Sequence, residues 1–499
     1  MIKVSFDGKV RIMKRLFLIS AVCLGTFMAT LDISIVNVAL PAIQQDLNAD
    51  MGMLQWIIDA YALCLSALIL SVGPISDRYG RKKVWLAGIA IFTFGSALCA
   101  IATTTNMLIW GRVTQGIAAA ALIPGALSII TQAFLNDIER VKIIGIWSAV
   151  SALSLIIGPI LGGLLVELFD WPTIFLINLP LGIVTLLLGW IGIDESADAE
   201  KAAFDPLGQC LSIVALAGVT YGLIEAGAQG WGSVMTIGGL TVGFLALISF
   251  VIVEMKVAKP LFPIFLFKTN QYFFQYNVAS FTLGFATYSN VFFIALFLQK
   301  GQGWGAFEAG LRMAPEFVAM ALFSFSFGHL TRLTSVRNLM ILGFVLIALT
   351  STALGLVNAD TAYTVIALLL FVLGAGMGMA TPAIGALIMG SVDKAYSGVA
   401  SAVMNALRQT GMTLGIALLG TLMTHQALNQ LRHDEMLMAT VPAQEVSLLI
   451  NNTSSVTLPY VAQAVRAAMT SGFNVAMIGG AGVVVFTLWL IVKRRKVNI

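Results

Sequence analysis

Three ionisable residues lie inside apolar stretches near the start of the chain, where a charged group is costly. Asp32 lies in the first apolar run, Asp59 in the second and Arg112 in the fourth. A charge in hydrocarbon costs about 2.5–3.5 kcal/mol on insertion scales, so such residues usually face a cavity or a partner and carry function. Two nearby carboxyl groups titrate as a coupled pair, and an arginine biases that titration. We therefore treat these residues as candidates for proton coupling.

Each of the three also has a purely structural alternative. Asp32 could make a helix-packing hydrogen bond, and Asp59 could cap its helix at the membrane interface. Arg112 could form a permanent pair with an interior acid or carbonyl, since an always-charged guanidinium needs a partner there. If the first two helices run antiparallel and side by side, Asp59 lies within a turn or two of Asp32.

The elements that must position these residues are membrane helices. The chain has 499 residues, of which 59% are hydrophobic and only 10% charged, and its mean hydropathy is +0.93. This composition predicts an all-α polytopic membrane protein. Apolar runs long enough to cross a bilayer number about fourteen. They cover residues 16–42, 53–73, 84–102, 106–132, 141–165, 174–193, 207–226, 234–254, 272–299, 309–330, 337–357, 362–388, 399–423 and 471–492.

The distribution of basic residues predicts the orientation. With an even number of spans both termini lie on one side, and all but six of the 28 Lys and Arg residues fall in the segments on that side. The positive-inside rule then places both termini in the cytoplasm.

A charged stretch between the second and third apolar runs carries glycines at fixed spacing. Its residues of interest are Gly73, Asp77, Arg78, Gly80, Arg81 and Lys82. Glycines allow close approach and unusual backbone angles, and the aspartate can receive N–H groups or an arginine of a neighbouring helix end. The simpler interpretation is a positive-inside anchor. The pattern resembles the loop between the second and third helices of the major facilitator superfamily, where it implies a conformational gate.

Two further motifs indicate which family within that superfamily the sequence resembles. The run Leu31 to Pro41 resembles a signature of the fourteen-span drug:proton antiporter family within that superfamily, and residues 111–116 match its fourth-span pattern. The resemblance implies a role for Arg112 in proton coupling. The antiporter motif is matched by Gly158, Pro159, Gly162 and Gly163. The stretches around Asp59, Glu225 and Asn405 resemble the methylenomycin A resistance type of this family.

A weak internal repeat indicates two halves. Gly73, Pro124 and Gly158 have echoes at Gly328, Pro382 and Gly415, at nearly constant offset. The offset leaves room for two extra spans, so we expect a 6+2+6 arrangement. The divisions are residues 1–193 for the first half, 194–270 for the inserted pair with its linkers, and 271–499 for the second half. The second half includes an expected external loop at 424–470.

Four other charged residues lie in or near spans. Glu225 ends the seventh run, where solvation is easy, and Arg408 matches a family pattern near the end of its run. Arg312 and Glu316 recur with Glu308 at four-residue spacing, so we expect them to pair on one helix face. Any of the four could belong to a cavity or a charge network.

The resemblance implies a proton-coupled exporter of drugs, antibiotics or other small amphipathic molecules, which lies in the cell membrane and works by alternating access. We expect its partners to be a small lipophilic or cationic substrate, protons and the lipid bilayer, without nucleic acid, and the protein to be monomeric. The sequence offers no catalytic constellation, nucleotide motif or metal-ligand spacing, so we expect no enzyme activity, metal or cofactor, and a proton gradient as energy source. Alternatives are a dedicated exporter of one metabolite or antibiotic and, more distantly, a channel or sensor.

Overall fold

The computed structural model describes residues 2–197, 205–257, 260, 262, 264–393, 397–441, 446–451 and 459–493, and helices dominate them. The first bundle contains α1 (Ile2–Asp46), α2 (Met51–Tyr79), α3 (Arg81–Ala100), α4 (Thr105–Ala133), α5 (Asp137–Phe169), α6 (Thr173–Leu176) and α7 (Asn178–Gly192). A hairpin of α8 (Pro206–Gln229) and α9 (Val234–Glu254) follows. The second bundle contains α10 (Ile264–Thr269), α11 (Gln271–Leu283), η1 (Gly284–Tyr288), α12 (Asn290–Leu296), η2 (Phe297–Gly301), α13 (Ala306–Phe325), α14 (Phe327–Leu333), α15 (Val336–Leu354), α16 (Tyr363–Gly390), α17 (Ser397–Arg432), α18 (Glu435–Thr440), α19 (Val446–Asn451) and α20 (Pro459–Val492).

The described helices include twelve that are long and apolar enough to cross a membrane. Helices α13 and α14, which meet at a 59° bend, add a thirteenth if they count as one span. Helix α17 is not among them, although its 36 residues are long enough. The all-helical membrane architecture is therefore confirmed, and the expected number of fourteen spans is not.

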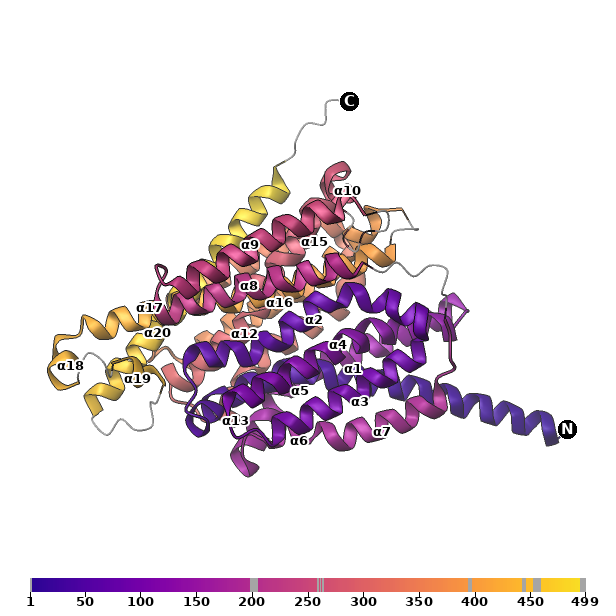
Figure 1. Cartoon of the computed structure of the whole chain (residues 1–499), viewed down its shortest axis with the longest axis horizontal. Coiled ribbons are helices and arrows are strands. Elements are labelled where there is room, and N and C mark those ends of the chain that lie inside the picture. Colours follow the sequence, from indigo (N-terminus) through magenta and orange to yellow (C-terminus); the bar gives the residue numbers. More distant parts are fainter. Residues whose placement is uncertain are drawn as a thin grey trace.

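The two bundles meet along two helix pairs, and the α8–α9 hairpin lies beside one of them. Helix α5 packs against α13, and α2 packs against α17. Helix α8 contacts α9, α2 and α17, so the hairpin runs along the α2–α17 side of the molecule (Figure 1).

Side-chain caps fix where several helices begin. The Asp50 carboxylate accepts a hydrogen bond from the Met53 amide at 2.7 Å, and Thr104 and Ser233 cap α4 and α9 in the same way. Such a cap satisfies an otherwise unpaired N–H group of the first turn. We call this end of the bundle the Asp50 end, and the opposite end, where α2 turns into α3, the Gly80 end.

The charged stretch at the Gly80 end is helix for most of its length, not the loop that the sequence suggested. Helix α2 continues through Asp77 to Tyr79, and α3 starts at Arg81. Gly80 alone makes the turn, with a φ of 105°, a conformation that glycine adopts without strain. Gly73 has open space around its Cα, so the expected close approach does not occur there.

The segment between α17 and α20 is shorter than the expected loop at 424–470. Helix α17 continues to Arg432 and α20 starts at Pro459, and the short helices α18 and α19 lie between them. Figure 1 shows α18 and α19 projecting at the left, opposite the start of α1. The expected boundaries were the ends of the apolar runs at 399–423 and 471–492, whereas α17 and α20 extend beyond these runs. Residues 442–445 and 452–458 of the expected loop lie outside the described residues.

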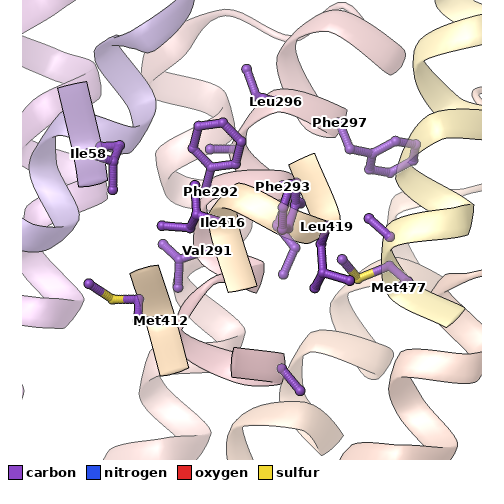
Figure 2. Packing of buried hydrophobic residues seen from close by; sticks show 14 of the residues in the cluster. Ile58, Val291, Phe292, Phe293, Leu296, Phe297, Met412, Ile416, Leu419 and Met477 are labelled. Atoms are coloured by element: carbon purple, nitrogen blue, oxygen red, sulfur yellow. The ribbon is translucent and has the colours of Figure 1, made fainter. Parts of the chain in front are cut away.

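The span at 271–301 is interrupted by two π-helical segments, η1 and η2, which the apolar pattern does not reveal. Such segments often occur at functional sites. This span packs in the core between the bundles. Figure 2 shows Ile58 of α2 pointing toward Val291, Phe292 and Ile416 of the second bundle, all buried.

The internal repeat has a counterpart in the packing. Gly158 of α5 faces Ser34 of α1, and its echo Gly415 of α17 faces Phe285 and Ser289 of the span at 271–301. Each glycine thus lets its helix approach the first long span of its own bundle. Pro124 and Pro382 both lie inside helices, α4 and α16.

Candidate functional site

Asp32 and Arg112 form an ion pair in the interior of the first bundle. The Nη1 group of Arg112 donates to Oδ2 of Asp32, and their side chains are 1% and 0% exposed. Removing two charges from water is costly, and only good geometry with further hydrogen bonds repays that cost. The structure therefore brings together two of the three residues that the sequence selected.

Gln115 completes this pair from the next turn of α4. Its Nε2 donates to Oδ1 of Asp32 at 3.0 Å and its Oε1 accepts from Arg112 at 2.8 Å. The same Nε2 lies 2.8 Å from Oγ of Ser96 on α3. Both carboxylate oxygens of Asp32 are thus hydrogen-bonded, which holds the carboxylate in one position.

The rest of the Arg112 guanidinium is also occupied. Its Nε donates to the carbonyl of Ile57 at 3.0 Å, and its plane lies over the ring of Tyr61 at 4.5 Å from the centroid. The Tyr61 hydroxyl in turn donates to the carbonyl of Ala29 at 3.0 Å. Helices α1, α2, α3 and α4 all contribute to the network, so movement of any one of them alters the pair.

Asp59 does not join this network, contrary to the expected proximity to Asp32. The face of α2 that meets α4 carries Ile57 and Tyr61, as the contacts of Arg112 and Gly116 show. At 100° per residue, Asp59 points to the opposite side of the helix. Asp59 is fully buried, and neither of its carboxylate oxygens has a hydrogen-bond partner among the described residues. The error came from placing the residue by depth alone, without its helical face.

The antiporter-motif glycines of α5 contact both bundles. A Cβ on Gly162 would lie 2.7 Å from the Ile35 side chain of α1. A Cβ on Gly163 would lie 2.5 Å from the Ala306 carbonyl oxygen and the Phe307 Cα of α13. Gly310 of α13 faces the carbonyl of Pro159 in return. Small residues permit this backbone-to-backbone approach of membrane helices.

Polar contacts between the bundles lie at the Asp50 end. Nε2 of Gln299 donates to the carbonyl of Val38 at 3.1 Å. Lys300 is buried, and its Nζ donates to Gln44 of α1 and, at 3.0 Å, to the carbonyl of Ile450 in α19. The Asp50 end is therefore closed in this structure.

The ion pairs found at the Gly80 end among the described residues lie within the first bundle and the segment after it. Lys14 pairs with Asp194 at 2.5 Å and Arg15 with Glu139 at 3.0 Å. Asp77 pairs with Arg81 of its own motif at 2.6 Å. This partner agrees with the expectation that Asp77 receives an arginine at a helix end.

Glu195 caps the start of α3 and was not selected from the sequence. Its carboxylate accepts hydrogen bonds from the amides of Lys82 and Lys83 at 3.1 and 3.3 Å. The Lys82 ammonium donates to the carbonyl of Trp190, and Arg78 lies over the ring of Tyr79. A carboxylate at a helix N-terminus is stabilised by the helix dipole. The segment after α7 thus holds the Gly80 turn.

We expect Gly80→Ala to destabilise the protein because the left-handed backbone and the Glu195 carboxylate both oppose a Cβ there. That Cβ would lie 2.6 Å from the Glu195 side chain. Strain of this kind costs about 1–3 kcal/mol. Gly73→Ala is the matched control, since nothing lies within 4 Å of its added Cβ. The thermal unfolding midpoint of purified protein should fall only for Gly80→Ala, and equal midpoints would contradict this account.

The four remaining candidates do not form one network. Arg312 lies over the rings of Trp304 and Tyr363, with its guanidinium carbon 3.5 and 4.4 Å from their centroids. Glu316 is fully buried, and in the described part of the chain neither of its carboxylate oxygens has a hydrogen-bond partner, so the expected pairing with Arg312 is wrong. The Arg312 guanidinium contacts these aromatic rings instead of the Glu316 carboxylate. Glu225 accepts from Gln229, and Arg408 donates to Asn405 and lies over Tyr288.

Residues 22–416 match the family model of the Major Facilitator Superfamily. The chain belongs to the Major Facilitator Superfamily. It is accordingly a multi-pass membrane transporter rather than an enzyme.

Among curated members of this superfamily, the chain is 31% identical to the methylenomycin A resistance protein of Bacillus subtilis, over 80% of this chain and 85% of that protein. It is 33% identical to the protein of the same name from Streptomyces coelicolor, over 81% and 85%. It is also 33% identical to the multidrug resistance protein Stp of Mycobacterium tuberculosis, over 82% and 76%.

Solved structures confirm the major facilitator fold. A bacterial homolog of the human lysosomal transporter Spinster, in an inward-facing and occupied conformation, superposes with a TM-score of 0.63 at 18% identity, over 96% of each chain.

Proposed function

We propose that this protein exports drugs, antibiotics or other small amphipathic molecules across the cell membrane in exchange for protons. The buried Asp32–Arg112 pair, bridged by Gln115, carries this proposal. A proton carrier needs a carboxyl group whose charge is balanced in one conformation and released in another. Similarity to methylenomycin and multidrug resistance proteins supports the substrate class. The proton gradient is the energy source, and the protein works as a monomer without a cofactor.

The proposed topology has fourteen spans, with α17 as one of them and both termini in the cytoplasm. Helix α17 packs against α20 and α11 of its own bundle and against α2 and α8, as a spanning helix would. The spans divide as six in residues 1–193, two in the 194–270 insertion and six in residues 271–499. The Gly80 end, with its basic side chains, is then cytoplasmic and the Asp50 end external.

With this orientation the closed end of the structure is the external one. The bundles are joined at the external end by Gln299 and Lys300. Transport exchanges this closure for one at the cytoplasmic end, where Asp77 and Arg81 form the gate. In the present state these two residues pair with each other.

The proposed function is tested in two steps. Expression in an efflux-deficient bacterial host should reduce susceptibility to particular compounds, which identifies substrates. Purified protein in liposomes with an acidic interior should then accumulate such a substrate, and a protonophore should abolish the accumulation. Accumulation that does not depend on the pH gradient would reject proton coupling. Transport that shows neither saturation nor exchange would indicate a channel.

A second candidate function is export of a single metabolite or antibiotic. The methylenomycin-type relatives favour it, because their names refer to one compound. The susceptibility profile separates the two candidates. A dedicated exporter protects against one chemical class only.

We expect Gly163→Ala to weaken the external closure. The added Cβ would meet the backbone of α13 at 2.5 Å, so α5 and α13 must separate. Overpacking of this kind costs about 1–3 kcal/mol, enough to raise the open population by about fivefold or more. The measurement is the labelling rate, by an impermeant thiol reagent, of a cysteine introduced at Ile43, which is buried at the closed end.

Gly145→Ala is the matched control for this prediction. Gly145 lies on the same helix, and nothing lies within 4 Å of an added Cβ. Its labelling rate should equal that of the parent protein without native cysteines. If Gly163→Ala also leaves the rate unchanged, the α5–α13 contact does not control closure.

A further inference from the structure

Asp59 lies at a junction of three helices that belong to three different parts of the chain. On α2, Trp56 contacts Tyr221 of α8, with ring centroids 6.4 Å apart. Gln55 contacts Gly420 of α17, whose added Cβ would lie 2.9 Å from the amide carbon of Gln55. Asp59 is three residues after Trp56 and four after Gln55, so it shares their helical face. It therefore faces the junction of α2, α8 and α17, which we call the α2–α8–α17 seam.

Helices α8 and α17 also place hydroxyl groups on this seam. The two helices are joined by the Thr421 hydroxyl, which donates to the carbonyl of Leu223 at 2.6 Å. Thr413 lies two turns before Gly420 on the same face of α17. On α8, Thr220 lies one turn before Ile224, and Ile224 faces Gly52 of α2. Both threonines are fully buried, and no described residue forms a hydrogen bond with Oγ1 of Thr220.

Cations of the surrounding helices are directed elsewhere. Arg112 of α4 reaches α2 on its opposite face, through Ile57, and is paired with Asp32. Arg408 of α17 lies over the ring of Tyr288. The nearest acid on α8 is Glu225, which lies about a turn and a half beyond Thr220 toward the external end. Its carboxylate accepts a hydrogen bond from Gln229. Arg112 and Arg408 thus provide no counter-charge for Asp59.

An ionised carboxylate in such a place carries a heavy penalty. Burial of a charge without a partner costs several kcal/mol after relaxation, whereas a protonated carboxyl group is far cheaper to bury. The seam can therefore close around the neutral acid and resists closing around the anion. Asp59 is eight residues from the start of α2, about 12 Å from the external end, so parting of α2 from α17 at Gln55 and Gly420 would admit water to it.

We propose that the α2–α8–α17 seam is a second protonation site, separate from the Asp32–Arg112 pair, and that Asp59 must take up a proton from the external side before that side can close. The inserted helix α8 forms the third wall of the site, which gives the α8–α9 hairpin a role in coupling. This inference rests on the proposed proton coupling and adds to it a protonation step that controls external closure. The proton is transferred from external water to the Asp59 carboxylate while the seam is open, and it is sealed in when the seam closes.

The test is the pH dependence of external closure, measured without substrate. Spin labels are attached to cysteines at Met53 of α2 and Gln430 of α17, both exposed near the external end, in full-length protein without native cysteines. Pulsed electron resonance gives the populations of the short and long distances. In the parent protein the short-distance population should fall as pH rises, by at most about tenfold per pH unit for one proton. A parent protein with no pH response would overturn the proposal without any variant.

Three variants show which carboxyl group causes the pH response of external closure. Asp59→Asn keeps the shape of the side chain without its charge and should remain closed at every pH. Asp32→Asn should keep the response, because its site is separate. Asp50→Asn removes a carboxylate from the same helix end and should also keep it, since Asp50 caps α2 and lies outside the seam. A response in Asp59→Asn equal to that of the parent protein would overturn the proposal.

The proposed function and the seam site can be rejected independently of each other. An intact pH response of closure in a protein that shows no proton-driven transport would reject the proposed function and leave the seam site standing. Proton-driven transport with a closure that ignores Asp59 would reject the seam site alone. Thr220→Val adds a check on α8: loss of the hydroxyl should shift the pH midpoint of closure, and an unchanged midpoint would remove α8 from the site.

Discussion

Arg112→Ala is expected to cause a large loss of stability. The change leaves the Asp32 carboxylate buried without its cation and removes the donor to the Ile57 carbonyl. Loss of one partner from a buried ion pair costs about 3–5 kcal/mol, mostly because the remaining charge is uncompensated. The thermal unfolding midpoint and the yield of folded protein in detergent should both fall sharply.

Two comparisons separate this effect from the loss of any arginine. Arg312→Ala removes a guanidinium held by ring contacts, which are worth about 0.5–2 kcal/mol. The double variant Asp32→Asn with Arg112→Gln removes both charges and should regain much of the stability lost in Arg112→Ala. If Arg112→Ala is no less stable than Arg312→Ala, the pair does not hold the first bundle together.

Asp32→Asn is expected to abolish proton-driven accumulation while the protein still binds and exchanges substrate. An asparagine can keep the contact with Gln115, but it cannot carry a proton or balance the Arg112 charge. In liposomes with an acidic interior, accumulation should fall to the level of substrate equilibration. Exchange of labelled against unlabelled substrate, which needs no net proton movement, should persist.

Asp46→Asn serves as the control for Asp32→Asn. Asp46 lies on the same helix and accepts a hydrogen bond from the Trp171 indole at 2.8 Å, outside the proposed carrier network. It should accumulate substrate like the parent protein. Wild-type accumulation and wild-type substrate-induced proton release by Asp32→Asn would show that another acid carries the proton, with Asp59 next to be tested.

The sequence predicted those features that depend on composition and on motif spacing. Helical membrane architecture follows from apolar run length, and the Asp32–Arg112 pair follows from the need of buried charges for partners. The match of residues 22–416 to the superfamily confirms the family resemblance. The motif glycines also lie where helices approach closely, as Gly163 does.

Features that depend on side-chain direction or on distant partners were not predictable in the same way. Asp59 lies at the expected depth but on the opposite face from Arg112, because depth follows from the run and direction follows from which helices become neighbours. Gln115 could have been found, since it follows Arg112 by three residues and so shares its face. Glu195 and Lys300 find their partners more than a hundred residues away, and no local pattern signals such contacts.

The hydrogen bond from Lys300 to Ile450 connects the inter-bundle closure to a surface segment. If the Asp50 end is external, α19 is reachable by antibodies and designed binders without crossing the membrane. A binder that holds α19 against η2 would keep Lys300 in place and arrest the cycle, whereas one that draws α19 away would remove a hydrogen-bond acceptor from a buried ammonium and favour opening. Inhibition of this exporter from outside the cell therefore does not require a molecule that enters the substrate path.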